Sequence, residues 1–130
     1  MNIAICEDNK TQSDLIKQMV RNWSIKGKNV IKITCYQSAE AFLFCLPEDG
    51  PFDILLLDIQ MKEMTGIDLA KQLRETKDEV IIIFITAMKE YVFEGYNVDA
   101  LQYLLKPIKE TSLFECLDKA VDKLKKQEQF

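Results

Sequence analysis

Histidine is absent from the sequence, and the four cysteines are widely spaced, with no pair separated by two residues. A zinc site is therefore not expected, because such sites are built from clustered cysteine and histidine ligands. We interpret all four cysteines as reduced, buried, small hydrophobic residues. They are Cys6, Cys35, Cys45 and Cys116.

Long apolar runs are also missing, since none approaches the length needed to span a bilayer. The N-terminal residues Met1, Asn2 and Ile3 have no basic flank of the kind that a signal peptide carries. We therefore expect a cytoplasmic protein that does not bind membranes. The net charge of −4 disfavours nucleic-acid binding by this chain alone, because that affinity depends on clustered Lys and Arg.

Glycine and proline are sparse, at four and three residues, while 48% of the 130 residues are hydrophobic and 29% are charged. This composition is typical of one compact globular domain rather than of a disordered chain. We assign residues 1–126 to that domain and 127–130 to a tail or the start of a linker.

Five apolar segments predict strands at 2–6, 30–36, 53–57, 80–85 and 100–105. Helical periodicity falls between and after them, at 15–23, 39–46, 66–77, 91–96 and 113–124, with Pro47 expected to end the second helix. The segment 80–85 is continuously apolar, as in a strand buried on both faces. Regular alternation of strands and helices predicts an α/β fold, a five-stranded parallel sheet with helices on both faces.

Hydrophilic side chains follow four of these strands: Glu7 and Asp8 the first, Asp58 the third, Thr86 the fourth and Lys106 the fifth. The carboxyl ends of parallel strands share one edge of the sheet, where open α/β folds bind ligands. Three crowded carboxylates repel one another, and Lys106 alone cannot balance them. A hard divalent cation could, and oxygen ligands without His or Cys favour Mg²⁺.

Asp58 ends the central strand and is the best-placed nucleophile toward phosphorus. Each of these residues alone has an ordinary structural explanation, as a capping acid, a turn hydroxyl or a solvated lysine. Their joint placement at one edge favours a functional site.

The set closely resembles the receiver domain of two-component response regulators, with the (βα)5 flavodoxin-like fold, from Asn2 to about Lys125. Five motifs occur in the family's order. They are Glu7-Asp8, Leu55-Leu56-Leu57-Asp58-Ile59-Gln60-Met61, Met64-Thr65-Gly66, Phe84-Ile85-Thr86-Ala87 and Tyr103-Leu104-Leu105-Lys106-Pro107.

By this resemblance, Asp58 accepts a phosphoryl group from a sensor histidine kinase, so the chain is a regulatory phosphoacceptor and not an enzyme in the usual sense. The resemblance assigns Mg²⁺ to Glu7, Asp8, Asp58 and the backbone carbonyl of Gln60. Aromatic residues at positions 91, 93, 96 and 103 belong to the face formed by the fourth helix, the fifth strand and the fifth helix, and we therefore expect a homodimer through this face on phosphorylation.

The remaining motifs imply three further roles. Thr86 and Lys106 bind the phosphoryl group, and Tyr103 matches the aromatic switch that moves inward when Thr86 is drawn toward it. The alternative for Tyr103 is ordinary packing of an amphipathic ring at a strand end. Pro107 matches the position of a cis peptide bond after the lysine.

The segment 91–108 resembles receivers that precede a LytTR-type DNA-binding domain, which is not part of this chain. DNA would be contacted only through such an output domain. The sequence departs from the family at Lys62, where proline is common. Gln60 and Met88 are not acids that would orient attacking water, so we expect slow to moderate dephosphorylation.

Three other classes of protein share parts of this pattern. A flavodoxin-like FMN binder is disfavoured because Glu7, Asp8 and Asn9 would repel the phosphate. An aspartyl phosphatase usually has a second acid two residues after the nucleophile, where this chain has Gln60. A pseudo-receiver that acts unphosphorylated as a docking or dimerisation module remains the stronger rival, although no site residue is lost.

Overall fold

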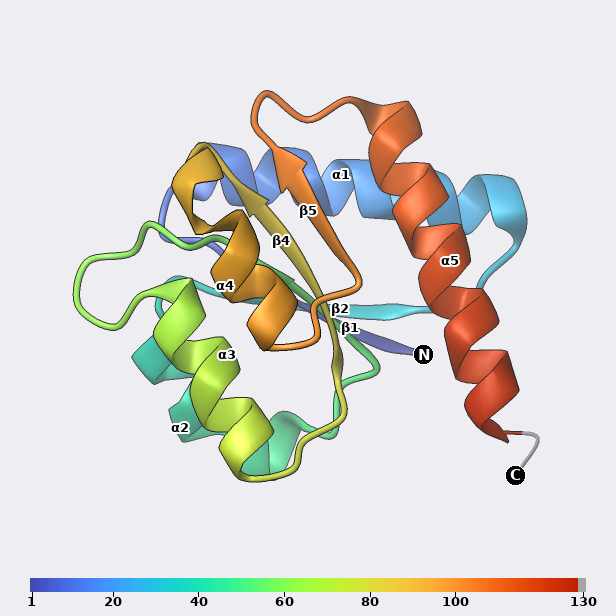
Figure 1. Cartoon of the computed structure of the whole chain (residues 1–130). Coiled ribbons are helices and arrows are strands. Elements are labelled where there is room, and N and C mark those ends of the chain that lie inside the picture. The colour runs from blue at the N-terminus through green and yellow to red at the C-terminus, as the bar shows by residue number, and fades with distance from the viewer. Residues whose placement is uncertain (129–130) are drawn as a thin grey trace.

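The computed structural model describes residues 1–128 and contains one five-stranded parallel sheet (Figure 1). The strand order is β2-β1-β3-β4-β5, so β3 is central. The predicted α/β fold with helices on both faces is confirmed. The elements are β1 (Asn2–Cys6), α1 (Lys10–Gly27), β2 (Lys32–Tyr36), α2 (Ala39–Asp49), β3 (Ile54–Leu57), α3 (Gly66–Glu75), β4 (Ile81–Thr86), a 3₁₀ turn (Lys89–Tyr91), α4 (Val92–Asn97), β5 (Gln102–Leu105) and α5 (Glu110–Glu128).

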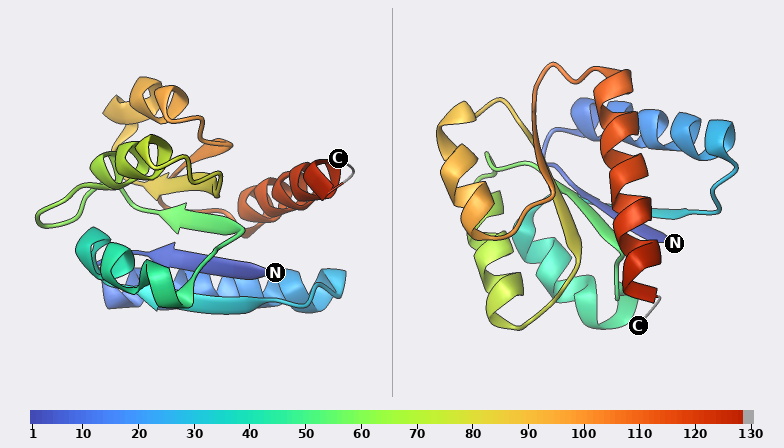
Figure 2. Two further views of the ribbon diagram at one scale, coloured as in Figure 1. Left: turned by 90° about the horizontal axis from the view of Figure 1, so that it is seen from below. Right: turned by 45° about the vertical axis from the view of Figure 1, so that its right-hand side comes forward.

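The sheet separates two hydrophobic cores. One core lies under α2, α3 and α4, and the other under α1 and α5 (Figure 2). Successive side chains of a strand point to opposite faces, so Leu55 and Leu57 enter the first core and Ile54 and Leu56 the second. All four are at most 1% exposed, which explains why this strand reads as a continuous apolar run.

Short polar residues fix where the helices begin. Asn9 caps α1, because its side-chain Oδ1 accepts a hydrogen bond from the backbone of Gln12 at 3.0 Å. Thr65 and Asp68 form a reciprocal capping box at the start of α3. Both caps lie at the carboxyl end of the sheet and therefore fix the loops that carry the functional residues.

The structure corrects two expectations. Helix α2 continues through Pro47 to Asp49. A proline in the last turn removes one backbone donor, and the turn is still closed by the Gly50 N–H, which donates to Leu46 O at 2.9 Å. The cysteines are not uniformly buried either, since Cys35 is exposed on the edge strand and Cys45 is half-buried.

Helix α5 extends through Glu128, so residues 127 and 128 of the expected tail are helical, and residues 129–130 lie outside the described part of the chain. Within residues 1–128, no helix combines the length and the apolar character that crossing a bilayer requires.

Candidate functional site

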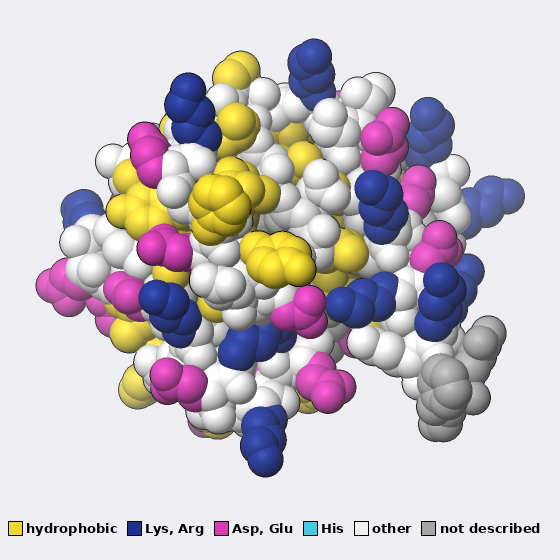
Figure 3. Space-filling view, viewed as in Figure 1, with side chains coloured by type: hydrophobic (Ala, Val, Ile, Leu, Met, Phe, Trp, Pro, Cys, Tyr) yellow, Lys and Arg dark blue, Asp and Glu magenta, His cyan; other side chains and the backbone are white. Residues whose placement is uncertain are grey.

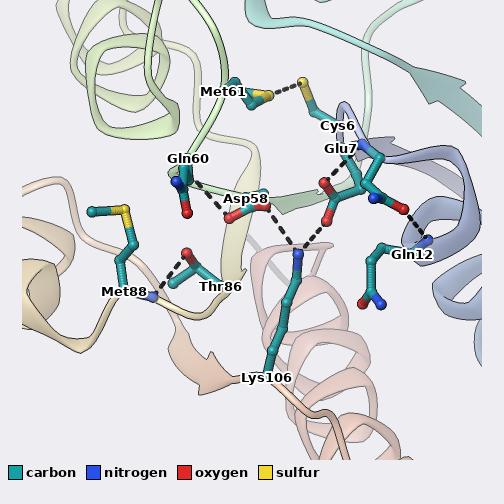
Figure 4. Close-up of polar contacts among 10 residues, drawn as sticks. Cys6, Glu7, Gln12, Asp58, Gln60, Met61, Thr86, Met88 and Lys106 are labelled. Carbon is teal, nitrogen blue, oxygen red and sulfur yellow. Dashed lines mark hydrogen bonds and ion pairs between the residues drawn. The ribbon is translucent and has the colours of Figure 1, made fainter.

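Asp58 follows β3 directly and is 6% exposed. Its backbone N–H donates to Cys6 O at 3.1 Å, and its Oδ1 accepts a hydrogen bond from the backbone N–H of Gln60 at 3.2 Å (Figure 4). Pairing of β1 with β3 places the end of β1 beside it. Asp58 is thus held at the centre of the sheet's carboxyl edge.

Glu7 and Asp8 reach the same place from the end of β1. Glu7 is 1% exposed, and its Oε2 accepts a hydrogen bond from the backbone N–H of Asn9 at 3.2 Å. Carboxylate oxygens of Glu7, Asp8 and Asp58 lie within 4.8 Å of one another. The structure therefore brings the three predicted acids into one cluster.

Lys106 projects into this cluster from the end of β5. Its Nζ lies 2.5 Å from Glu7 Oε1 and 3.0 Å from Asp58 Oδ2 (Figure 4). The Lys106–Pro107 peptide bond is cis, as the resemblance implied, and so is the bond between Gly50 and Pro51, which the sequence did not indicate. Backbone pairing with Thr86 fixes the start of this loop, since Lys106 N–H donates to Thr86 O at 2.9 Å.

The charges of the cluster perturb its ionisation. Burial raises the pKa of Glu7 even though Lys106 and the Asn9 N–H stabilise the carboxylate. Burial alone would lower the pKa of Lys106, but its hydrogen bonds to Glu7 and Asp58 outweigh that cost and raise it. One lysine faces three acids, so a dication is electrostatically favoured at this edge.

Thr86 and Tyr103 are linked through one loop residue, Met88. Thr86 is fully buried, and its Oγ1 accepts a hydrogen bond from the backbone N–H of Met88 at 3.2 Å. The Tyr103 hydroxyl donates to the carbonyl oxygen of the same Met88. The Tyr103 ring is half-buried, with its centroid 5.8 Å from that of Phe84. The loop after β4 is therefore held from both sides.

A cavity of about 560 Å³ opens over the cluster. Glu7, Asp8, Asp58, Gln60 and Lys106 line it, whereas Thr86 is fully buried and is not among the lining residues. Sequence reasoning missed several lining residues because nothing marks them in the sequence, as they lie on the flank of a helix or in a loop. These are Gln12, Leu15 and Ile108.

Gly66 allows the loop after Asp58 to fold back on itself. A Cβ at Gly66 would lie 2.1 Å from the carbonyl oxygen of Asp58, well inside any van der Waals contact. The Gly66 N–H donates to Ile59 O at 3.0 Å. This close approach packs the first turn of α3 against the backbone that carries Asp58.

The donor set fits a hard divalent cation. Glu7, Asp8 and Asp58 supply carboxylate oxygens, and the backbone of Gln60 lies against Asp58. Mg²⁺ prefers such ligands together with water, and the cavity above the cluster is open to solvent. The residues present are therefore compatible with the magnesium site expected from the sequence.

The family model described as the response regulator receiver domain matches residues 3–118. The chain belongs to this family. Receiver domains are regulatory phosphoacceptor domains of two-component signalling systems, which agrees with the arrangement of acids, threonine and lysine at the edge of this sheet. The resemblance inferred from the sequence is thus confirmed.

Two curated relatives match almost all of the receiver domain. It is 39% identical over 129 residues to the sensory transduction protein LytT of Bacillus cereus, covering 99% of this chain and 49% of that protein. It is 32% identical over 120 residues to the positive alginate biosynthesis regulatory protein of Pseudomonas aeruginosa, covering 92% of this chain and 47% of that protein. The chain spans about half the length of these relatives, consistent with the receiver portion of a LytTR-type regulator.

Solved structures support the fold. The response regulatory domain of protein mrkE from Klebsiella pneumoniae superimposes with a TM-score of 0.87 at 24% identity, covering 97% of this chain and 99% of that one. The response regulator TrrA from Thermotoga maritima, in complex with Mg²⁺ and BeF, superimposes with a TM-score of 0.76 at 23% identity. The match covers 92% of this chain and 97% of that one.

Proposed function

We propose that Asp58 accepts a phosphoryl group from the phosphohistidine of a sensor histidine kinase. The observation that supports this most strongly is the position of Asp58. Its buried carboxylate lines a cavity beside two further acids, and the ammonium group of Lys106 bridges it to Glu7. This arrangement suits a nucleophile that attacks an anionic phosphorus centre.

In the transfer, an oxygen of Asp58 forms a bond to phosphorus while the bond from phosphorus to the histidine nitrogen breaks, and that nitrogen keeps the electron pair and takes up a proton. Lys106 exchanges its contacts with Glu7 and Asp58 for the phosphoryl oxygens. Mg²⁺, held by the carboxylates of Glu7, Asp8 and Asp58 and the carbonyl of Gln60, would neutralise those oxygens.

The Thr86 hydroxyl would couple the phosphoryl group to the surface of the domain. Drawing it toward the phosphoryl oxygens removes the acceptor from Met88 N–H, and Tyr103 follows through its bond to Met88 O.

Hydrophobic side chains gather over α4, on the face beside β5 (Figure 3). Val92, Phe93 and Tyr96 are 47%, 84% and 84% exposed. We propose that the phosphorylated domain forms a homodimer through the α4–β5–α5 face.

The output of this switch would be transcription, through a LytTR-type DNA-binding domain outside this chain. The support is the LytT relative, twice as long as the matched segment. DNA would bind only to that domain, and the receiver would act in the cytoplasm together with its kinase.

Intact-mass measurement after incubation with acetyl phosphate and Mg²⁺ tests the phosphoacceptor role. We expect one adduct of about 80 Da, lost in Asp58→Asn and in the absence of magnesium. Asp53→Asn, at the opposite end of the same strand, is the matched control and should keep the adduct. A folded protein that neither acetyl phosphate nor a cognate kinase can phosphorylate would instead be the unphosphorylated docking module.

The lifetime of the adduct tests a finer point of the same proposal. Gln60 and Met88 flank the site and offer no acid to orient an attacking water. We therefore propose slow to moderate dephosphorylation, measured as decay of the adduct after acetyl phosphate is removed. Loss of the adduct within seconds would contradict this.

A further inference from the structure

Positive charge is concentrated in one segment of the chain. Residues 15–39 contain five cations and no acid, although the whole chain has a net charge of −4. This segment forms most of α1, the following loop and the edge strand β2, so it gathers on one side of the molecule. The five cations are Lys17, Arg21, Lys26, Lys28 and Lys32.

A groove of about 260 Å³ lies within this segment, between α1 and β2. Arg21, Ser24 and Ile25 line it from the helix, and Ile31 and Ile33 from the region of the strand. Ile25 is 78% exposed, far more than a core residue would be. The groove shares no lining residue with the cavity over Asp58.

The backbone of β2 is available beside this groove, because β2 is an outer strand of the sheet (Figure 2). Lys32 N–H donates to Met1 O, and Tyr36 O accepts from Glu7 N–H, so these residues bond inward to β1. The bonds of a parallel strand alternate along it, which directs the backbone groups of Ile33 and Cys35 outward. Such an edge can pair with an extended chain.

We propose that the groove between α1 and β2 binds an extended acidic peptide segment of a partner protein, which adds as a strand to the free edge of β2. Apolar side chains of the peptide would enter the groove beside Ile25 and Ile33. Its carboxylates would face Arg21, which lines the groove, and, on the opposite face of the added strand, Lys32 of β2.

The charge distribution favours this occupant over two others. A second copy of the chain paired through β2 would bring two acid-free cationic segments together, which is repulsive. A membrane surface would satisfy the lysines, but it presents no strand to bond the outward amides of Ile33 and Cys35. A concave site beside an edge strand instead suits a peptide.

Selection of short peptides from a random library displayed on phage, with the whole chain as target, tests the proposal. Enriched sequences should combine Asp or Glu with alternating apolar residues. A synthetic peptide of the enriched sequence should bind about tenfold or more weakly to Arg21→Glu and more weakly at high salt. Lys71→Glu, an exposed charge reversal on α3, is the matched control and should bind as the unaltered chain does.

Amide exchange measured by NMR separates strand addition from other contacts. Bound peptide should slow exchange at Ile33 and Cys35, which have outward N–H groups. Asp58→Asn should bind the peptide equally well, because the groove is separate from the phosphoacceptor site. Enrichment of peptides without acids, equal binding to Arg21→Glu, or unchanged exchange at Ile33 and Cys35 would overturn the proposal. So would binding to phosphatidylserine vesicles without binding to any selected peptide.

Discussion

Lys106 is the counter-charge of the acid cluster. Its substitution by methionine leaves Glu7 and Asp58 buried beside each other without a cation. Removing one partner of a buried ion pair typically costs 3–5 kcal/mol, and we expect about 3 kcal/mol here because Lys106 retains some solvent contact. Urea unfolding of Lys106→Met in EDTA measures the loss, and added Mg²⁺ should recover part of it.

Lys10 provides the matched control for that experiment. Its Nζ lies 3.2 Å from Asp14, but the two side chains are 76% and 62% exposed. A solvated pair of this kind contributes little, so Lys10→Met should lower the free energy of unfolding by less than about 0.5 kcal/mol. Equal losses in the two variants would show that Lys106 is not holding the acids together.

The cysteines differ in their expected reactivity. Burial raises the pKa of Cys6 to about 12 and that of Cys116 to about 11, so both remain protonated well above neutral pH. Because the thiolate is the reactive form, a raised pKa suppresses labelling until strongly alkaline pH. Alkylation at about pH 8 followed by mass spectrometry should modify Cys35 first, and Cys35→Ser should lose the fast phase. Early labelling of Cys6 would contradict this.

The acids and the lysine of the site could be located from the sequence because they stand at the ends of apolar runs, and the strand ends bring them to one edge of the sheet. The contacts around Met88 could not be predicted in the same way. They join the buried Thr86 hydroxyl on β4 to the Tyr103 side chain on β5 through backbone atoms of Met88. Every residue has these backbone atoms, so residue type does not reveal such contacts. The exposure of Cys35 likewise depends on β2 being an outer strand of the sheet.

At the scale of elements, the start of α3 depends on Gly66. A methyl group there would collide with backbone at Asp58, which cannot move aside as a side-chain end can. Gly66→Ala should therefore lower both the thermal midpoint and the yield of phosphorylated protein. Gly27→Ala is the control, since its methyl group would meet only the movable side-chain amide of Asn29, and helix propensity favours alanine. Full phosphorylation of Gly66→Ala would show that the close approach is dispensable.

Element types were predictable, while some boundaries were not. Asn9 and Thr65 are favourable N-cap residues, and α1 and α3 begin directly after them because their side chains accept hydrogen bonds from backbone N–H groups of the first turn. The prediction that Pro47 ends α2 was wrong, because in the final turn of a helix the missing backbone N–H of a proline costs little stability. The strand β2 begins at Lys32, two residues later than its β-branched run, since pairing with β1 sets its length.

At the scale of the molecule, dimerisation through α4 can be tested against a second exposed aromatic residue. Tyr96 on α4 is 84% exposed, and Phe44 on α2 is 87% exposed. With Mg²⁺ and beryllofluoride bound, light scattering should report a doubled mass for the unaltered chain and for Phe44→Glu, and a monomer for Tyr96→Glu. An unaltered chain that stays monomeric would refute the dimer.

The division of the interior by the sheet has a further consequence for signalling. Alternate side chains of β3 pack into two separate cores. The strand that precedes Asp58 therefore cannot shift toward either helical layer without disrupting the packing on both of its faces. Phosphorylation of Asp58, at the carboxyl end of β3, is therefore expected to change the hydrophobic interior very little. The conformational change that follows phosphorylation is therefore transmitted through the loops at the edge of the sheet. The outer faces of the helices are not constrained by this pathway and can be adapted to different partner proteins.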